Sequence, residues 1–147
     1  SRVAAEKEFR ALQLVFSKGV AVPEPIRQNR HVVVMGMIEG GELAEWKEIP
    51  TPERILLQIL RSIRKAYLKA GIIHADLSEY NIILKPDMHI LIIDWPQYVT
   101  AEHPNAEQLL ARDVQNVLSF FRRKYKLKTE LQEVMAYVTG KGKMPVL

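Results

Sequence analysis

The segment from Gly71 to Gln97 concentrates the side chains that could carry out chemistry. It reads GIIHADLSEYNIILKPDMHILIIDWPQ and places Asp76, Asn81 and Asp94 next to short apolar runs. Phosphoryl transfer needs metal ions that bridge the phosphates and a group that orients the attacking hydroxyl. Mg²⁺ prefers oxygen ligands, which Asn81 and Asp94 supply. Asp76 is a candidate acceptor for the hydroxyl proton. The segment therefore predicts a phosphoryl-transfer site.

The order of these residues is more informative than any one of them. A single Asp or Asn is more often a turn former or a helix cap than a functional group. The joint pattern H-x-D-x-x-x-x-N, followed by strand, turn, strand and Asp, is rare by chance. The functional interpretation is therefore favoured over the structural one. Ile83 and Ile93 of the expected hairpin are predicted to form the floor beneath an adenine ring.

Two further polar residues need an explanation. His74 has no second histidine at metal-ligand spacing, so we expect an architectural role in which it holds the loop. Asp113 interrupts an apolar helical stripe, LLARDVQNVL, and a buried carboxylate is unfavourable unless it is paired. It could accept hydrogen bonds from backbone amides of the catalytic loop. A salt bridge with Arg112 or another cation is an equally favoured alternative.

Alternating helical and extended patterns predict the elements that position this segment. In the first helix Val3, Phe9, Leu12 and Phe16 form the expected apolar face. The Thr51-Pro52 pair is typical of a helix start, with Thr51 as N-cap. Helices are expected over residues 2–18, 42–47, 51–71, 106–126 (with a kink or break) and 129–140, and strands over 31–38, 72–73, 82–84 and 89–93; residues 95–105 are expected to be mostly loop.

Composition limits the class of protein. The 147 residues are 48% hydrophobic and 26% charged, which is typical of a globular domain and excludes a disordered chain. The absence of cysteine excludes disulfides and cysteine zinc sites and favours a cytoplasmic location. No apolar run approaches about 20 residues, so no membrane span is expected, and the charged opening SRVAAEKEFR shows no signal peptide. The net charge of +4 is compatible with an anionic ligand or RNA and demonstrates neither.

The motifs together resemble the RIO family of atypical protein kinases. HADLSEYN resembles the catalytic loop of the protein-kinase superfamily, and IIDW its metal-binding segment. More specific to RIO kinases are the Ser-Glu-Tyr within that loop, the IDWPQ sequence and the downstream HPNAEQLLARDVQNVLSFF. The front segment, SRVAAEKEF and VPEPIRQNRHVVVMGMIEG, is most similar to the RIO2 branch. The resemblance covers nearly the whole chain.

This resemblance implies an α+β, protein-kinase-like fold. Residues 1–38 would be a remnant of the N-lobe, with helix C and the strand that leads to the hinge, and residues 39–147 would be the C-lobe. The implied activity is that of an ATP-dependent serine/threonine kinase or ATPase with Mg²⁺ or Mn²⁺. The implied partner is the pre-small-ribosomal-subunit particle, rRNA and protein, in whose maturation the family acts. The protein substrate is not implied.

The resemblance also assigns roles to individual positions. Asp76 matches the catalytic Asp, and Asn81 and Asp94 match the metal-binding residues. In ATPase behaviour Asp94 could itself be transiently phosphorylated. The implied nucleotide-binding positions are Glu8, the helix C glutamate; Met35, the gatekeeper; Gly36 and Ile38, through their backbone groups; and Ile83 and Ile93.

Some features of the family pattern are missing from the sequence as given. A glycine-rich loop and a strand lysine normally precede the Glu8 position, but seven residues precede it here and none fits. The expectation is therefore that this segment alone binds ATP weakly and turns over little. Two alternatives stay open: a small-molecule phosphotransferase of the aminoglycoside or choline type, in which Trp also often follows the metal Asp, and a catalytically weak kinase-like assembly module.

Overall fold

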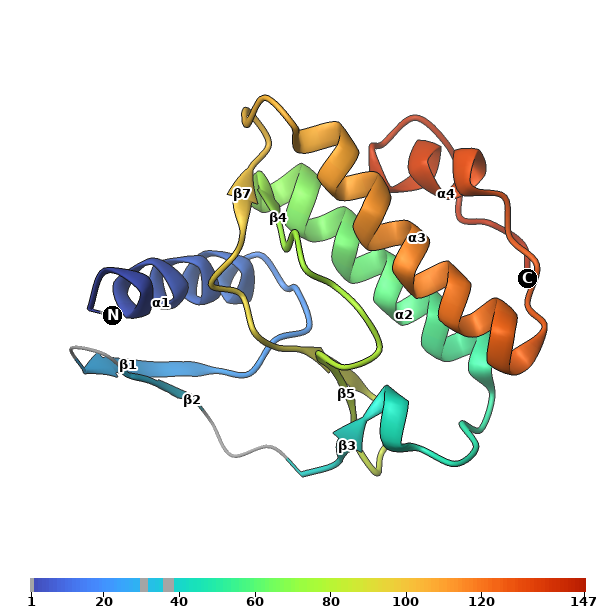
Figure 1. The fold of residues 1–147 in the computed structure, drawn as a ribbon, viewed down its shortest axis with the longest axis horizontal. Helices are drawn as coiled ribbons and strands as arrows, with labels where there is room; N and C mark the ends of the chain where they lie inside the picture. The colour runs from blue at the N-terminus through green and yellow to red at the C-terminus, as the bar shows by residue number, and fades with distance from the viewer. Residues whose placement is uncertain (1, 30–31, 36–38) are drawn as a thin grey trace.

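Packed helices form the main body of the molecule. The computed structural model describes residues 2–29, 32–35 and 39–147. In it α2 (Pro52–Lys65) and α3 (Ala106–Tyr125) lie side by side, and α4 (Leu131–Val138) packs against both (Figure 1). The expected break in α3 is wrong: the helix is continuous, because no proline or glycine interrupts it and its apolar stripe is maintained.

The ends of α2 differ in part from expectation. Thr51 does occupy the N-cap position, but it adopts a left-handed conformation with φ 47° and its side chain makes no capping hydrogen bond. Pro52 begins the helix, as expected. The chain continues as a π-helical turn, η2 (Ala66–Ala70), and Gly71 ends it with φ 66°. Gly71 suits this position because glycine has no Cβ to clash in the left-handed region.

A small three-stranded sheet carries the expected hairpin. Strand β5 (Ile82–Leu84) pairs with β6 (Ile90–Ile92) on one side and with β3 (Gly41–Glu42) on the other, all antiparallel. A 3₁₀ turn, η1 (Leu43–Glu45), follows β3. A separate antiparallel pair, β4 (Ile72–Ile73) and β7 (Val99–Thr100), brings the start of the Gly71–Gln97 segment beside the chain that follows its end. Strand β7 lies where mostly loop was expected.

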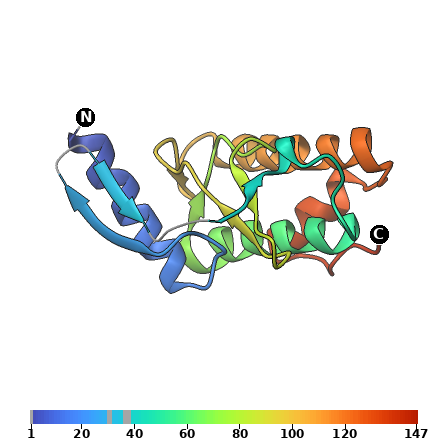
Figure 2. The same ribbon diagram turned by 90° about the horizontal axis from the view of Figure 1, so that it is seen from below.

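The amino-terminal part forms its own small layer. Helix α1 (Arg2–Ser17) lies beside an antiparallel hairpin of β1 (Pro25–Asn29) and β2 (Val32–Met35), at one end of the molecule (Figure 2). Strand β1 was not among the expected strands. The predicted apolar face of α1 is partly wrong, since Val3 and Phe16 are 74% and 44% exposed. The buried side chains of α1 are Ala5, Ala11, Leu12 and Val15.

One apolar core joins these layers. Leu12 and Val15 of α1 belong to the same cluster of buried side chains as Leu56 of α2 and Phe121 of α3. The sheets supply Ile82 and other members to it. The fold is thus α+β, with the site segment spanning the space between α1 and the helical body. None of the helices in the described ranges is long and apolar enough to cross a bilayer.

Candidate catalytic and metal-binding site

The predicted catalytic loop is closed by Asn81. This side chain is 6% exposed, and its Oδ1 accepts a hydrogen bond from the Ser78 amide at 2.8 Å. Its Nδ2 donates to the Asp76 carbonyl at 2.6 Å. The Asp76 carboxylate itself is exposed to solvent. The loop therefore presents Asp76 outward and holds Asn81 inward beneath it.

Backbone hydrogen bonds bring Asp94 to this loop. The Ile93 amide donates to the Asn81 carbonyl at 2.9 Å, which places the exit of β6 beside the entrance of β5. Asp94 follows directly and is exposed, with φ 60°. A positive φ is uncommon for residues other than glycine and redirects the chain after the strand. The backbone at Asp94 thus adjoins the loop that carries Asp76 and Asn81, and we call this place the junction.

Glu8 reaches the same junction from α1. Its Oε2 accepts a hydrogen bond from the Trp95 amide at 3.2 Å, one residue after Asp94. Burial raises the pKa of Glu8 above its ordinary 4.5, the Trp95 hydrogen bond opposes that shift, and the nearby Asp94 charge adds to it. This contact ties α1 to the backbone that follows Asp94. The family resemblance implied a nucleotide-binding role for Glu8 but gave no sign of this amide partner.

His74 holds the loop from the inside, as predicted. Its Nδ1 accepts a hydrogen bond from the Asp76 amide at 3.2 Å, so Nε2 carries the proton and donates to the Ile93 carbonyl at 2.8 Å. Its ring lies 4.8 Å from that of Trp95, centroid to centroid. Burial lowers the pKa of His74, in line with a neutral ring. His74 thereby links the catalytic loop to the segment before Asp94.

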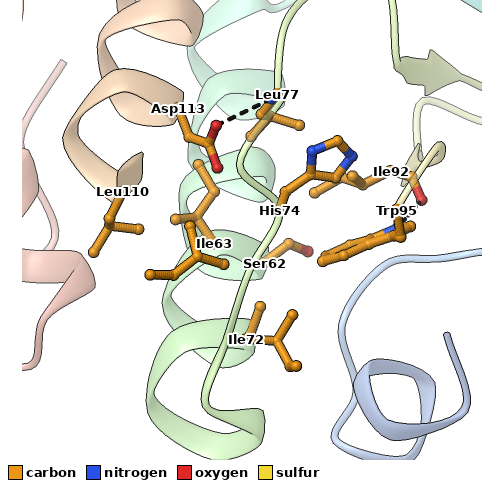
Figure 3. Close-up of a pocket in the computed structure, with 11 residues that line it drawn as sticks. Ser62, Ile63, Ile72, His74, Leu77, Ile92, Trp95, Leu110 and Asp113 are labelled. Carbon is orange, nitrogen blue, oxygen red and sulfur yellow. Dashed lines mark hydrogen bonds between the residues drawn. The ribbon is translucent and has the colours of Figure 1, made fainter. Parts of the chain in front are cut away.

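Asp113 supports the loop from α3. Its two carboxylate oxygens accept hydrogen bonds from the amides of Ala75, at 2.8 Å, and Leu77, at 3.1 Å; Figure 3 shows the latter, with His74 lying between Asp113 and Trp95. Of the two interpretations of Asp113, the loop-amide one is therefore correct. Arg112 does not pair with it but donates to the Ala75 carbonyl at 2.6 Å.

Asn116 completes this set of supports. Its Nδ2 donates to the Leu77 carbonyl at 3.1 Å. Sequence reasoning missed the loop contacts of Arg112 and Asn116. The signal for Asn116 was its spacing from Arg112, since residues four apart lie on one helix face. Both amide and carbonyl groups of Ala75 and Leu77 are therefore held by one helix, which fixes a loop whose Ala75 has φ 71°.

The cavity beneath this loop is a packing feature. Its volume is about 10 Å³, which leaves room for about one water molecule. The lining comes from α2, α3 and the loop, and includes Ser62, Ile72, Leu110 and Trp95 (Figure 3). Such a volume excludes a nucleotide. The predicted chemistry is therefore expected on the exposed side of the junction, where Asp76 and Asp94 lie.

The other positions predicted to bind the nucleotide lie in separate parts of the chain, and two of them are not described by the structure. Ile83 is buried on β5 and Ile93 is half-buried after β6, so their neighbouring strands bring them to the same sheet. Met35 ends β2. Gly36 and Ile38 lie outside the described residues.

Few of the described side chains at the junction could act as ligands for a hard cation such as Mg²⁺. In the described ranges no group of three or more His, Cys, Asp or Glu side chains could hold a metal. Asp94 has an exposed carboxylate, and the Asn81 oxygen keeps one lone pair beyond its bond to Ser78. Mg²⁺ is commonly held by one or two carboxylates together with substrate phosphates. These residues are therefore compatible with a metal that arrives with a nucleotide.

Comparison with known proteins supports the resemblance. A family model described as the RIO domain matches residues 1–134. The RIO-type serine/threonine-protein kinase Rio2 of Methanocaldococcus jannaschii is 42% identical over 149 residues, covering 95% of this chain and 54% of the relative. The chain thus spans about half the length of that relative.

Solved structures of RIO kinases are similar to this chain in fold. The crystal structure of the Rio2 kinase from Chaetomium thermophilum matches with a TM-score of 0.79 at 30% identity, covering 97% of this chain and 48% of that one. Its ADP/Mg²⁺-phosphoaspartate complex matches with a TM-score of 0.74 at 30% identity, covering 97% and 46%. The predicted α+β, protein-kinase-like fold is confirmed, and the chain belongs to the RIO family of atypical protein kinases.

Proposed function

We propose that this chain is the catalytic region of a RIO-type serine/threonine kinase or ATPase that uses ATP with Mg²⁺ or Mn²⁺. The observation that carries the proposal is the hydrogen bond from the Ile93 amide to the Asn81 carbonyl, at 2.9 Å. That bond, with the one from Asn81 to the Asp76 carbonyl, links the backbone at Asp94 to the loop that carries Asp76 and Asn81, which supports a shared site for these three residues. Family membership supplies the reaction class.

Each residue at the junction has a proposed role. Asp76, exposed on a fixed loop, would accept the proton of the attacking hydroxyl. Asp94 and the free lone pair of Asn81 would hold the metal ion, which when bound supplies charge neutralisation at the phosphates. Glu8 would fix the direction of Asp94 through the Trp95 amide. Ile83 and Ile93 would lie under the adenine ring, with Met35, Gly36 and Ile38 at its edge.

We extend the proposal to a phosphorylated intermediate on Asp94. The Chaetomium thermophilum relative has been solved as a phosphoaspartate complex with ADP and Mg²⁺. In this chain an oxygen of the exposed Asp94 carboxylate would attack the γ-phosphorus of ATP, and the bond to the ADP oxygen would break. Water would then hydrolyse the acyl phosphate and regenerate the carboxylate. Such a cycle is an ATPase cycle.

Variants of the full-length protein test these roles. Asp76→Asn and Asp94→Asn should each lower phosphoryl transfer and ATP hydrolysis by about 100-fold or more, because each removes a group that acts on the reacting phosphate. Asp87→Asn is a matched control, since Asp87 is an exposed aspartate on the β5–β6 turn. Unchanged turnover in both site variants would contradict the proposal.

The acyl phosphate on Asp94 can be detected separately from ATP turnover. Denaturation during turnover of radiolabelled ATP should trap a label that hydroxylamine releases. The label should be absent in Asp94→Asn and present in Asp87→Asn. If wild-type protein hydrolyses ATP without any such label, the intermediate is ruled out while the kinase assignment survives.

The proposed setting is the cytoplasm, in maturation of the small ribosomal subunit, with rRNA and protein of the precursor particle as partners. Support comes from membership of the family and, for location, from the cysteine-free sequence. Tagged full-length protein should sediment with small-subunit precursors. Its absence from those fractions at low and moderate salt would exclude this partner.

A further inference from the structure

A groove runs between α2 and the turn that joins β5 to β6. Its volume is about 580 Å³. The turn lies at the opposite end of the hairpin from Asn81 and Asp94, so the groove is separate from the candidate catalytic site. The lining residues that matter to its chemistry are Arg54, Leu57, Gln58 and Arg61 from α2, and Asp87, Met88 and His89 from the turn.

The wall formed by the turn is fixed to α2 by Gln58. Its Nε2 donates to the Met88 carbonyl at 2.8 Å, and its Oε1 accepts from the Ile90 amide at 3.2 Å. Met88 has φ 68°, at a turn position that usually favours glycine. A bidentate side-chain anchor and a left-handed methionine give the groove a preformed shape with an apolar patch of Leu57 and Met88.

The charge on the groove is not balanced. Arg54 and Arg61 lie two turns apart on α2, about 10 Å along its axis. Both are exposed, and within the described ranges neither guanidinium has a hydrogen bond or ion pair. Asp87 is the acidic residue among the described lining, and Lys85, at 3.7 Å, and His89, at 3.3 Å, already contact its carboxylate. Two arginines therefore face the groove without a counter-charge.

We propose that this groove docks an acidic segment of a protein partner, in extended conformation, with an apolar side chain over Met88. Two forked cations at this spacing suit carboxylates three residues apart in an extended peptide of polyproline II type, because three residues there advance about 9 Å and return to the same face. A nucleic acid is a poorer fit, because its affinity comes from several phosphate contacts and the described lining offers two guanidinium groups. The inference does not depend on the proposed catalytic function.

Binding assays on the full-length protein test the proposal. The probe is a short fluorescein-labelled peptide of repeating Glu-Glu-Leu triplets; a Lys-Lys-Leu peptide and labelled oligouridylate serve as comparisons. We expect anisotropy to report binding of the acidic peptide alone, weakened by added salt. The double variant Arg54→Glu/Arg61→Glu should bind it about tenfold or more weakly. Lys18→Glu/Lys69→Glu, which reverses two exposed cations outside the lining, is the matched control.

A second readout locates the peptide without charge reversal. With ¹³C-methyl methionine labels, the Met88 resonance, assigned from Met88→Leu, should shift on titration, whereas that of Met135 on α4 should not. Failure of the acidic peptide to bind, equal loss in the lysine control, or an unmoved Met88 signal would each overturn the proposal. Loss of oligouridylate binding alone in the arginine variant would reassign the groove to nucleic acid.

Discussion

Two buried ionisable side chains hold the loop that carries Asp76. Asp113, on α3, accepts hydrogen bonds from two backbone amides of the loop. His74 links the loop to the end of strand β6, just before Asp94. Both are at most 4% exposed. Buried polar groups stabilise a structure only when their partners are present, and removing one partner leaves the other unsatisfied at a cost of about 1–3 kcal/mol. The loop geometry is therefore sensitive to single substitutions that do not touch the reacting groups.

Replacing Asp113 should weaken the fold through this loop. Asp113→Ala leaves the amides of Ala75 and Leu77 without acceptors, so the free energy of unfolding should fall by about 2–5 kcal/mol. Asn116→Ala is the matched control on the same helix: it removes one bond to a carbonyl and should cost about 1 kcal/mol. Urea unfolding measures both. Equal losses in the two variants would show that the carboxylate is not the main support.

His74 should make stability depend on pH. Burial lowers its pKa from the ordinary 6.5, against smaller opposing effects of the Ile93 hydrogen bond and nearby carboxylates. Between the lowered pKa and 6.5 the unfolded chain binds more protons, so stability rises with pH there, by at most about 1.4 kcal/mol per pH unit. This contribution is complete above 6.5 and lost as pH falls through the folded-state pKa.

The matching experiment compares slopes of stability against pH. His74→Phe keeps a ring against Trp95 but cannot titrate, so its unfolding free energy should vary less between about pH 5 and 7 than that of wild type. His103→Gln, at an exposed histidine, should retain the wild-type slope. A wild-type slope in His74→Phe would assign the dependence to other groups. Asp113 is not one of them, because burial raises its pKa and therefore makes stability fall, not rise, with pH.

At the level of single residues the sequence was informative where a pattern carried chemistry. The spacing of Asp76, Asn81 and Asp94 was sufficient to place them at strand ends, because short apolar runs define those ends. Neither the bond of Glu8 to the Trp95 amide nor that of Arg112 to the Ala75 carbonyl was foreseen. Side-chain contacts with backbone depend on which loop folds over which helix, and local sequence does not encode that.

Among the elements, the three-stranded sheet depends on one glycine. Gly40 precedes β3 with φ +131°, and a Cβ there would lie 2.5 Å from the Leu84 carbonyl oxygen and 2.9 Å from the Lys85 Cα. The close approach lets β3 pair with β5. Strands β1, β3 and β7 were not predicted, since short strands defined by long-range pairing lack the periodic pattern that identified α2 and α3. The short helix expected over 42–47 is only in part correct, because β3 takes its first residue and the 3₁₀ turn η1 ends at Glu45.

Gly40→Ala should therefore separate β3 from β5. The backbone clash adds to the conformational cost, so we expect a loss of about 3 kcal/mol. Gly71→Ala is the matched control: Gly71 has φ +66° but nothing within 4 Å of its Cβ position, so only the left-handed cost of about 1–2 kcal/mol applies. Thermal unfolding compares the two. A smaller loss at Gly40 than at Gly71 would mean that the β3–β5 contact adjusts freely.

For the whole molecule, the shared core predicts how the two expected domains, residues 1–38 and 39–147, unfold. Leu12 and Val15 are fully buried in the cluster that also contains Leu56 and Phe121. The Ile92 amide further donates to the Ala21 carbonyl at 2.8 Å, next to the Glu8 contact. Two segments that share one core are expected to unfold together.

Leu12→Ala tests that coupling in the full-length protein. Truncation of a fully buried leucine should cost about 2–5 kcal/mol, and with one cooperative core the loss should speed amide hydrogen exchange in α3 as well as in α1. Val3→Ala is the matched control on the same helix, because Val3 is 74% exposed and its truncation should change exchange little. Faster exchange confined to α1 would show that residues 1–38 open independently, as a separate lobe would.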